Sequence, residues 1–460
     1  MSGSRKTFRS RQGELLDRLR DDILSGQLKV GDYLPSEKAI AEDYGISNKT
    51  VRKVLDILVA EKLIEKLPRV GNIVTGRSKE GVVTIKLGYH GSTLHETELK
   101  ELLALFHKAH PNIVVQDVAL PNNSPETLQQ YMEYGMFDVI TLSDTEFRHF
   151  RENGSLHLLS PMGVNPQINP FLSRAFTDQE TLYLQPFVYS PNVVCYNRDH
   201  FAQAGLLEPD SGWTWEELFE MSDKLTVPNE RIGFNFNATH RNRISLILMQ
   251  GGSKFERNAE GKYRLNGSGM MDSFRFYLDI LSQRIAPFIP GGSWEFSSEE
   301  LFAQGKVSMI ITTYLSLNHL RKSKIHYELA PLPSRDGKSV TLLIALALAV
   351  NKQSAHKDEA YKLVEFLTSP AAQMIIRQKT LSIPALKPAA DWVGKESLYR
   401  PSRYNLYREI VPTFRLGSEL GLSQAQWQTF VREVALYWAG LEQEEVFSER
   451  LERKFNEMSV

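Results

Sequence analysis

Hydrophobic residues near the N-terminus recur with the spacing of an α-helix. In residues 11–24, leucine and isoleucine occupy one face of a predicted helix, and Gly26 ends the pattern. Ser36 is placed to cap a second helix that extends to Tyr44. Ser47 is placed to cap a third helix, predicted over residues 47–60. The spacing therefore predicts three helices in the first 60 residues.

The turns between these segments define the kind of domain. Gly45 separates the second and third helices, and a short helix, a glycine turn and another helix are typical of a helix-turn-helix. Residues 63–66 and 73–74 are expected to pair as a two-stranded hairpin with its tip at residues 68–72. We therefore predict a mainly α, winged helix-turn-helix domain in residues 1–79.

A continuous stretch of this region resembles the winged-helix domain of the GntR family of bacterial regulators. The stretch is ILSGQLKVGDYLPSEKAIAEDYGISNKTVRKVLDILVAEKLI, and it contains the family's Gly-Asp, Leu-Pro-Ser-Glu and Ser-x-x-Thr-Val-Arg elements in order. The resemblance implies that residues 47–60 form a recognition helix in the DNA major groove. Asn48 and Arg69 depart from the family pattern, which commonly has arginine and a wing glycine there, and this indicates an altered operator.

The DNA-contacting residues expected from this resemblance have suitable chemistry. Hydroxyl and amine groups bind phosphate, while asparagine and arginine can contact a base edge with two hydrogen bonds. We expect the N-terminal residues of the recognition helix to be exposed. The predicted DNA-binding residues are Ser36, Lys38, Ser47, Asn48, Lys49, Thr50, Arg52, Arg69 and Gly71.

Hydrophobic runs and helical patterns alternate in the remaining chain, residues 80–460. Strands are predicted at residues 83–88, 113–116 and 137–142, with a helix at residues 96–107. Residues 342–350 form the most apolar stretch, about half the length that a membrane-spanning helix needs, and we interpret it as a buried strand. This alternation favours an α/β architecture with largely parallel sheets.

Six segments of this region resemble the extracellular solute-binding proteins that deliver oligosaccharides to ABC importers. They occur in the order found in that family and include PFVYSPNVVCYNRDHFAQAGLLEPDSGWTWEELFEMSDKL and FAQGKVSMI. The resemblance implies a two-lobed, periplasmic-binding-protein-like domain that closes on a ligand. Bulky aliphatic residues at 342–344 replace the family's glycine-rich turn, which puts that part of the cleft in doubt.

The ligand cleft is expected where loops leave the strand ends. Sugars are bound by planar hydrogen-bonding groups and by aromatic platforms. The loop at residues 234–237 is a further possible source of contacts. The predicted ligand-binding residues are His90, Ser92, Asp144, Tyr189, Ser190, Asn192, Trp294 and Tyr314.

Charge and cysteine content agree with an N-terminal nucleic-acid contact and a reducing compartment. The chain has a net charge of −1, but residues 1–77 contain 15 Lys and Arg residues against 11 Asp and Glu residues. A single cysteine, Cys195, excludes an intramolecular disulfide and sits in an apolar run typical of a buried site. No signal-peptide pattern opens the sequence, so we expect a cytoplasmic location without membrane association.

The sequence gives little support to a catalytic or metal-binding function. His107 and His110 could bind a metal, but no third ligand is evident, and we interpret them as solvated histidines. The enzyme alternative is a GntR-type regulator with a pyridoxal-phosphate-binding, aminotransferase-like body. It needs a Schiff-base lysine in a glycine- and arginine-containing turn, and Lys324 is the only loose match. We therefore expect no enzymatic activity and no cofactor.

These observations predict a transcription regulator that binds operator DNA and senses a small solute, a di- or oligosaccharide. One winged helix reads few base pairs, so two copies are expected to bind an inverted repeat, as a homodimer at least on DNA.

Overall fold

The structure is a computed structural model that divides into two compact units. It describes residues 8–24, 27–29, 31–67, 71–75, 82–120, 124–238, 240–281, 298–395 and 398–458. One unit holds residues 1–84 with 110–114, and the other holds 85–109 with 115–460. The boundary predicted at residues 79 and 80 lies outside the described residues. The strands β3 (Val83–His90) and β4 (Ile113–Leu120) are part of the large sheet of the second unit.

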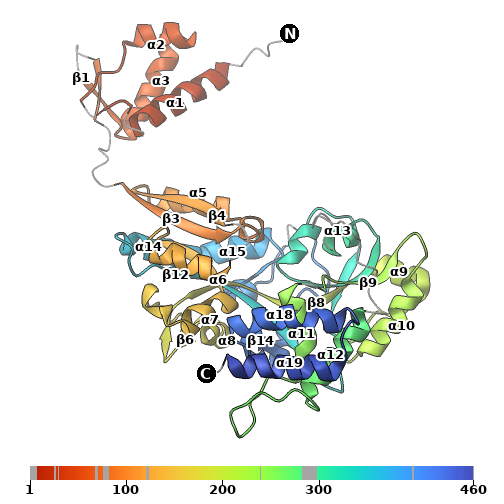
Figure 1. Ribbon diagram of the computed structural model, residues 1–460. Coiled ribbons are helices and arrows are strands. Elements are labelled where there is room, and N and C mark those ends of the chain that lie inside the picture. Colours follow the sequence, from red (N-terminus) through yellow and green to blue (C-terminus); the bar gives the residue numbers. More distant parts are fainter. Residues whose placement is uncertain are drawn as a thin grey trace. The chain divides into compact units, whose positions relative to one another are not determined.

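The first unit contains three helices and a hairpin, as its sequence predicts (Figure 1). The helices α1, α2 and α3 pack around a core that includes Leu15, Leu19, Val54 and Leu55. The hairpin is antiparallel, with Ile64 opposite Val74. The elements are α1 (Phe8–Leu24), α2 (Glu37–Tyr44), α3 (Asn48–Ala60), β1 (Ile64–Leu67) and β2 (Gly71–Val74).

The second unit is built on one mixed ten-stranded sheet, whose main path runs β4-β3-β5-β12-β8-β10-β9. The sequence prediction of largely parallel sheets is wrong, because β12 is antiparallel to its two neighbours on this path, β5 and β8, and β8 is antiparallel to β10. These strands are β3 (Val83–His90), β4 (Ile113–Leu120), β5 (Val139–Ser143), β8 (Gln185–Asn197), β9 (Ile232–Asn235), β10 (Val307–Thr313) and β12 (Thr341–Val350).

Two long strands connect the lobes of this unit and explain the mixed sheet. All 13 residues of β8 are buried, and β12 is almost entirely buried, as its apolar sequence predicts. Each strand continues from one lobe into the other, so it pairs with different neighbours along its length. The short strands are β6 (Thr177–Asp178), β7 (Thr181–Leu182), β11 (Tyr327–Ala330), β13 (Ile383–Pro384) and β14 (Phe414–Leu416).

Helices cover the sheet in two groups that define the lobes (Figure 1). The first lobe carries β3, β4 and β5 with α4 (Thr93–Glu96), α5 (Leu99–Ala109), α6 (Pro125–Glu133), α7 (Asp144–Glu152), α8 (Pro170–Ala175), α14 (Lys357–Leu367), α15 (Pro370–Lys379) and α16 (Lys387–Ala390). The second lobe carries β9, β10 and β11 with α9 (Arg198–Ala204), α10 (Trp215–Leu225), α11 (Arg241–Met249), α12 (Gly269–Asp279), α13 (Ser298–Ala303), α18 (Gln424–Trp438) and α19 (Glu444–Glu457). The helix α17 (Leu406–Glu409) contributes Tyr407 to a hydrophobic cluster that extends into both lobes.

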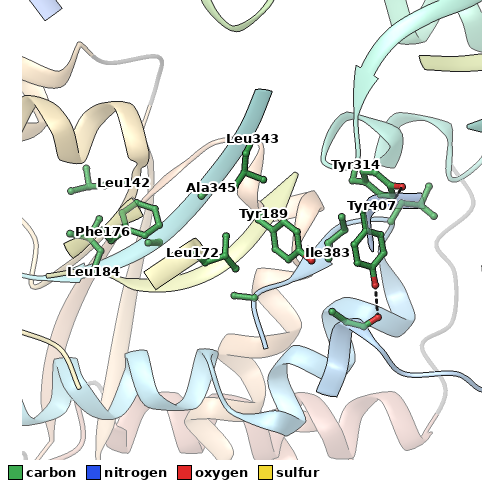
Figure 2. Packing of buried hydrophobic residues seen from close by; sticks show 14 of the residues in the cluster. Leu142, Leu172, Phe176, Leu184, Tyr189, Tyr314, Leu343, Ala345, Ile383 and Tyr407 are labelled. Atoms are coloured by element: carbon green, nitrogen blue, oxygen red, sulfur yellow. Dashed lines mark hydrogen bonds between the residues drawn. The ribbon is translucent and has the colours of Figure 1, made fainter. Parts of the chain in front are cut away.

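Hydrophobic clusters fill the interior of the second unit. One of them extends into both lobes, and in it Tyr189, Tyr314 and Tyr407 gather around Ile383 (Figure 2). The Tyr407 hydroxyl donates a 2.7 Å hydrogen bond to the Ala390 carbonyl. Another cluster includes Trp215, Phe274 and Phe430 of the second lobe. Among the described residues, no helix combines the length and apolar character needed to cross a bilayer.

Candidate functional site

The N-terminal end of α3 presents a polar, exposed surface in the first unit. Ser47 caps the helix, with its Oγ accepting a 3.2 Å hydrogen bond from the Thr50 amide. Asn48, Lys49 and Arg52 are exposed on the first two turns. These side chains offer amide, ammonium and guanidinium donors, which are the groups that contact phosphates and base edges.

Thr50 requires a correction, because it was expected among the exposed residues of this helix. Its side chain is only 4% exposed, and its Oγ1 lies 2.8 Å from the Ser47 Oγ in a hydrogen bond. Thr50 lies one position before the buried Val51 and shares the inward face of the amphipathic helix. In this structure Thr50 supports the capping residue and offers almost no surface to DNA.

Other predicted DNA-binding residues flank α3. Ser36 caps α2, accepting a 3.2 Å hydrogen bond from the Ala39 amide, and Lys38 is exposed two residues later. Gly71 begins β2 with a φ of 139°, a conformation that residues with a Cβ rarely adopt. Arg69 lies outside the described residues.

An ion pair joins α2 to α3. The Arg52 Nε donates to Glu37 at 2.6 Å, although the Arg52 side chain is 65% exposed. The hydrogen bond and the charge of Glu37 raise the pKa of Arg52. Arg52 is thus held at the exposed surface by a partner that water or an anion can replace.

The second unit contains a cavity of about 440 Å³ with walls from both lobes. Most of its polar lining residues follow strand ends or lie near helix N-termini. The lining consists of His90, Ser92, Thr93, Glu96, Ser143, Glu146, Asn237, His240, Asn242, Arg243, Glu299, Thr313, Leu315, Ser316, Ile344 and Leu346. The described lining includes no Phe, Tyr or Trp, so the aromatic platforms expected for sugar faces are absent from it.

A histidine–carboxylate pair dominates the first-lobe wall. The His90 Nε2 lies 2.9 Å from a Glu146 carboxylate oxygen, and its Nδ1 lies 2.9 Å from the Thr141 Oγ1. Burial acts to lower the pKa of His90, but the hydrogen bond and charge of Glu146 outweigh it and raise that pKa. Burial acts to raise the pKa of Glu146, and His90 more than reverses this effect. The pair therefore favours an imidazolium beside a carboxylate.

Two further polar groups of this wall are held in unfavourable surroundings. Burial raises the pKa of Glu96 to about 7, against the opposing effects of a hydrogen bond with Ser92 and the charge of His90. The hydroxyl of Thr93 is buried and has no hydrogen-bond partner among the described residues. Perturbed titratable groups beside a cavity are typical of functional sites.

The second-lobe wall comes mainly from the start of α11. Arg243 is 8% exposed, its Nη1 donates to the Asn192 Oδ1, and burial lowers its pKa to about 10. Burial and the charge of Arg243 lower the pKa of His240. Glu299, from α13, accepts a 2.7 Å hydrogen bond from the Thr312 Oγ1.

The structure brings together only part of the predicted ligand-binding set. His90 and Ser92, which follow β3, line the cavity. Trp294 lies outside the described residues. Five residues, Asp144, Tyr189, Ser190, Asn192 and Tyr314, are buried and do not line the cavity, which corrects their predicted role as ligand contacts.

Each of these five side chains is engaged within the protein. Burial raises the pKa of Asp144 to about 7, and its Oδ1 accepts a 3.5 Å hydrogen bond from the Ala345 amide. Ser190 accepts a hydrogen bond from the Leu315 amide at 3.0 Å, and Asn192 donates to the Leu342 carbonyl at 2.8 Å. Tyr189 packs against Phe171 and Tyr407, and the Tyr314 hydroxyl donates to the Tyr404 carbonyl at 2.8 Å.

Sequence reasoning missed the charged residues of the cleft. Glu146 had a local signal, because Ser143 and Glu146 form a capping box directly after β5. Glu96, His240, Arg243 and Glu299 had no comparable signal, since each lies in a helix or helix cap that only tertiary packing brings to the cavity. No group of three or more His, Cys, Asp or Glu side chains suited to a metal ion occurs in the described part of the chain.

Comparisons with known families agree with this two-unit architecture. Residues 92–374, more than half of the chain, match the family model described as "Bacterial extracellular solute-binding protein", and the chain belongs to this family. Residues 11–74 match the model "Bacterial regulatory proteins, gntR family". The chain therefore joins a GntR-type DNA-binding domain to a solute-binding domain. These matches give no support to an aminotransferase-like body.

Individual relatives cover one domain or the other. A candidate binding protein of Brucella abortus (strain 2308) is 26% identical over 208 residues, 44% of this chain and 49% of the relative. The mannosyl-D-glycerate transport/metabolism system repressor MngR of Escherichia coli (strain K12) is 39% identical over 61 residues, 13% of this chain and 25% of the repressor. The chain thus spans about half, or less, of the length of these curated relatives.

A solved structure shows the fold of the second unit. The ABC substrate-binding protein of Listeria monocytogenes, in complex with cycloalternan, aligns with a TM-score of 0.67 and 19% identity. The alignment covers 82% of this chain and 99% of the Listeria protein.

Proposed function

We propose that the protein is a cytoplasmic transcription regulator that binds operator DNA and senses a small solute. The effector is a carbohydrate, a di- or oligosaccharide, and the protein carries out no catalysis. The observation that carries this proposal is the presence, in one chain, of a GntR-type domain and a solute-binding fold with a polar cavity between its lobes. The DNA-binding domain supports a location beside the chromosome.

The effector acts by changing the relative stability of open and closed lobes. A ligand shifts such an equilibrium only by its different affinities for the two states. A ligand that contacts His90 from one lobe and Arg243 from the other binds the closed state more tightly. Lobe closure is then coupled to operator binding, and the coupling must be reciprocal.

The test begins with the full chain and a library of sugars. A ligand at a hundred times its dissociation constant stabilises the folded protein by about 2.7 kcal/mol, which a thermal-shift screen detects. Operator affinity is then measured with and without the identified sugar, and sugar affinity with and without operator. We expect both affinities to change by the same factor, roughly 5- to 150-fold. Unchanged operator affinity at saturating sugar would overturn the coupling.

A variant of the cleft isolates the ligand effect. Glu146→Gln removes the carboxylate that pairs with His90 in the cavity wall. We expect this variant to lose the sugar response while binding ligand-free operator like the wild type. The matched control is Glu133→Gln, an exposed position on α6 of the same lobe that lies outside the cavity lining.

Two copies of the protein are expected on each operator. One winged helix reads few base pairs, so specificity requires two recognition helices on half-sites about one helical turn apart. The mass of the complex in solution, measured with an inverted-repeat operator, should correspond to two chains per duplex. A complex with one chain per operator would contradict this part of the proposal.

A further inference from the structure

Arg243 is the one arginine or lysine among the described residues that line the cavity, and it has no ion-pair partner among the described residues. Its Nη1 donates to an amide oxygen, the Asn192 Oδ1, and no carboxylate of the described residues forms an ion pair with it. Glu299 acts on it only as a charge that raises its pKa against the effect of burial. A buried charge without a nearby opposite charge is energetically unfavourable. An anion bound beside this guanidinium would therefore be stabilising.

Each carboxylate of the same cavity has a hydrogen bond with a neighbouring side chain. Glu146 accepts hydrogen bonds from the Ser143 amide at 2.6 Å and from the Ser143 Oγ at 2.8 Å, and it pairs with His90. Glu299 accepts from Thr312 at 2.7 Å, and Glu96 has a hydrogen bond with Ser92. Arg243 lines the same cavity, and the group that accepts its hydrogen bond is the neutral amide of Asn192.

The neighbours of Arg243 are also donors. The His240 Nδ1 accepts a 3.2 Å hydrogen bond from the Asn242 amide, so the neutral ring carries its proton on Nε2. Asn237 and Asn242 add side-chain amides to the same wall. All four residues lie at or just before the N-terminus of the nine-residue helix α11, whose dipole favours negative charge there.

We propose that Arg243, at the N-terminus of α11, binds an anionic group of the effector, so that the effector is an acidic, hydroxylated solute. The group is a carboxylate or a phosphate, since a guanidinium binds either through paired N–H donors. The hydroxyls of the solute contact the first-lobe wall at Ser92, Glu96 and Glu146. This inference rests on the proposed function and narrows its ligand class from carbohydrates in general to acidic ones.

The experiment compares matched neutral and anionic probes on the full chain. The pairs are glucose with glucuronate, glucose with glucose 6-phosphate, and maltitol with maltobionate, each measured by calorimetry and by the thermal shift. We expect an anionic member to bind more tightly than its neutral partner, and the carboxylate and phosphate pairs distinguish the two sources of charge. Inorganic phosphate alone is expected to compete with this anionic probe for binding.

Variants at position 243 assign the effect to the guanidinium. Arg243→Gln retains a donor to Asn192 but removes the charge, and we expect it to weaken the anionic probe roughly 10- to 100-fold. Arg243→Lys retains the positive charge but loses the planar guanidinium with its paired N–H donors. Its affinity for the anionic probe should therefore lie between those of Arg243→Gln and the wild type. Unfolding temperatures without ligand verify that both variants fold.

Arg241→Gln is the matched control for these variants. Arg241 is two residues earlier, and burial also lowers its pKa to about 10, but it does not line the cavity. Its Nη1 donates to Gln424 at 2.5 Å, and its guanidinium lies 4.7 Å from the Trp427 ring centroid. We expect Arg241→Gln to bind the anionic probe like the wild type.

The outcomes separate this inference from the proposed function. If a neutral sugar binds and changes operator affinity, and Arg243→Gln binds it equally well, the anionic site is overturned while the proposed function stands. If Arg243→Gln loses affinity equally for the neutral and anionic members of a pair, Arg243 binds a hydroxyl, and the anionic site is again overturned. If no probe of either class binds or alters operator affinity, the proposed function fails and this inference fails with it.

Discussion

Two arginines, one in each unit, show how differently the protein prepares its two binding surfaces. The Arg52 side chain is 65% exposed and is held by Glu37 at 2.6 Å. Arg243 is 8% exposed and meets only an amide oxygen among the described residues. An exposed ion pair is screened by water and salt and exchanges partners easily, whereas a buried guanidinium is sensitive to the charge beside it.

This difference has a consequence for recognition. If α3 is the recognition helix, DNA must replace the Glu37 carboxylate before Arg52 can contact a base or phosphate. In the described part of the cleft, no carboxylate forms an ion pair with Arg243, so an anionic ligand would not have to displace one. We therefore expect DNA binding to depend strongly on salt and the choice of effector to depend strongly on charge.

The largest effect is expected where a residue predicted to contact ligand is instead part of the core. Tyr189 packs with ring centroids 5.6 Å from Phe171 and 6.2 Å from Tyr407. Tyr189→Ala should lower the free energy of unfolding by about 3–5 kcal/mol, as measured by urea denaturation. Ser92→Ala, at an exposed cleft position, should change it by less than about 0.5 kcal/mol. A loss below about 1 kcal/mol for Tyr189→Ala would contradict its assignment to the core.

Glu96 should give the cleft a measurable pH dependence. Burial raises its pKa from 4.5 to about 7, so the folded protein holds this proton more tightly than the unfolded chain. Its contribution to stability is therefore lost as pH rises from about 4.5 to about 7. Glu96→Gln should stabilise the protein by about 2–3 kcal/mol at pH 8 and leave it unchanged at pH 4.

The control for this pH effect is Glu101→Gln. Glu101 lies on α5 of the same lobe and forms a surface ion pair with Lys379 at 2.7 Å. Thermal unfolding of both variants across this pH range should show the stabilisation at high pH only for Glu96→Gln. If the stabilities of Glu96→Gln and the wild type changed with pH in the same way, ionisation of Glu96 would not destabilise the folded protein, which would contradict the prediction.

Some of the residues that line the cleft could be predicted from the sequence, and others could not. His90 and Ser92 could be predicted because β3 ends at His90, and residues after a strand end face the cleft. Tyr189, Ser190 and Asn192 were misplaced because β8 continues through them to Asn197, buried on both faces. No local pattern distinguishes such a continuous strand from one that ends at a hinge.

Two other errors are displacements by one residue. Thr313 and Leu315 line the cavity, while Tyr314 between them is in the core. Similarly, Ser143 lines the cavity, and the adjacent Asp144 is buried beside the Ala345 amide. Neighbouring residues at a strand end point in opposite directions, so an uncertainty of one position reverses the assignment. The first unit was predicted more completely because its caps and helical periodicity are local signals.

On the DNA-binding side, Arg52 and Lys49 should have distinguishable roles. Arg52→Ala should lower affinity for the specific operator roughly 5- to 150-fold, because an arginine can form two hydrogen bonds to a base edge. Lys49→Ala should weaken binding to all sequences and reduce the salt slope by about one, as expected for one phosphate contact. Mobility-shift titrations at several salt concentrations measure both effects.

Arg18→Ala provides the control for these two variants. Arg18 is an exposed cation on α1, outside the predicted DNA-binding set. The Arg18→Ala variant should bind specific and unrelated DNA with the same affinities as the wild type. If Arg52→Ala and Lys49→Ala both behave like this control, α3 is not the recognition helix.

The smallest effect concerns Ser36, which could serve DNA binding, helix capping or both. Its Oγ accepts a hydrogen bond from the Ala39 amide at 3.2 Å, so Ser36→Ala should lower stability by about 1 kcal/mol. Ser36→Asp separates the two roles, because aspartate caps a helix about as well as serine but adds a negative charge. If Ser36 lies against a phosphate, Ser36→Asp should retain the stability of the wild type and bind all DNA sequences more weakly. If Ser36 is only a cap, Ser36→Asp should match the wild type in both urea denaturation and mobility-shift titration, and Ser36 would leave the predicted DNA-binding set.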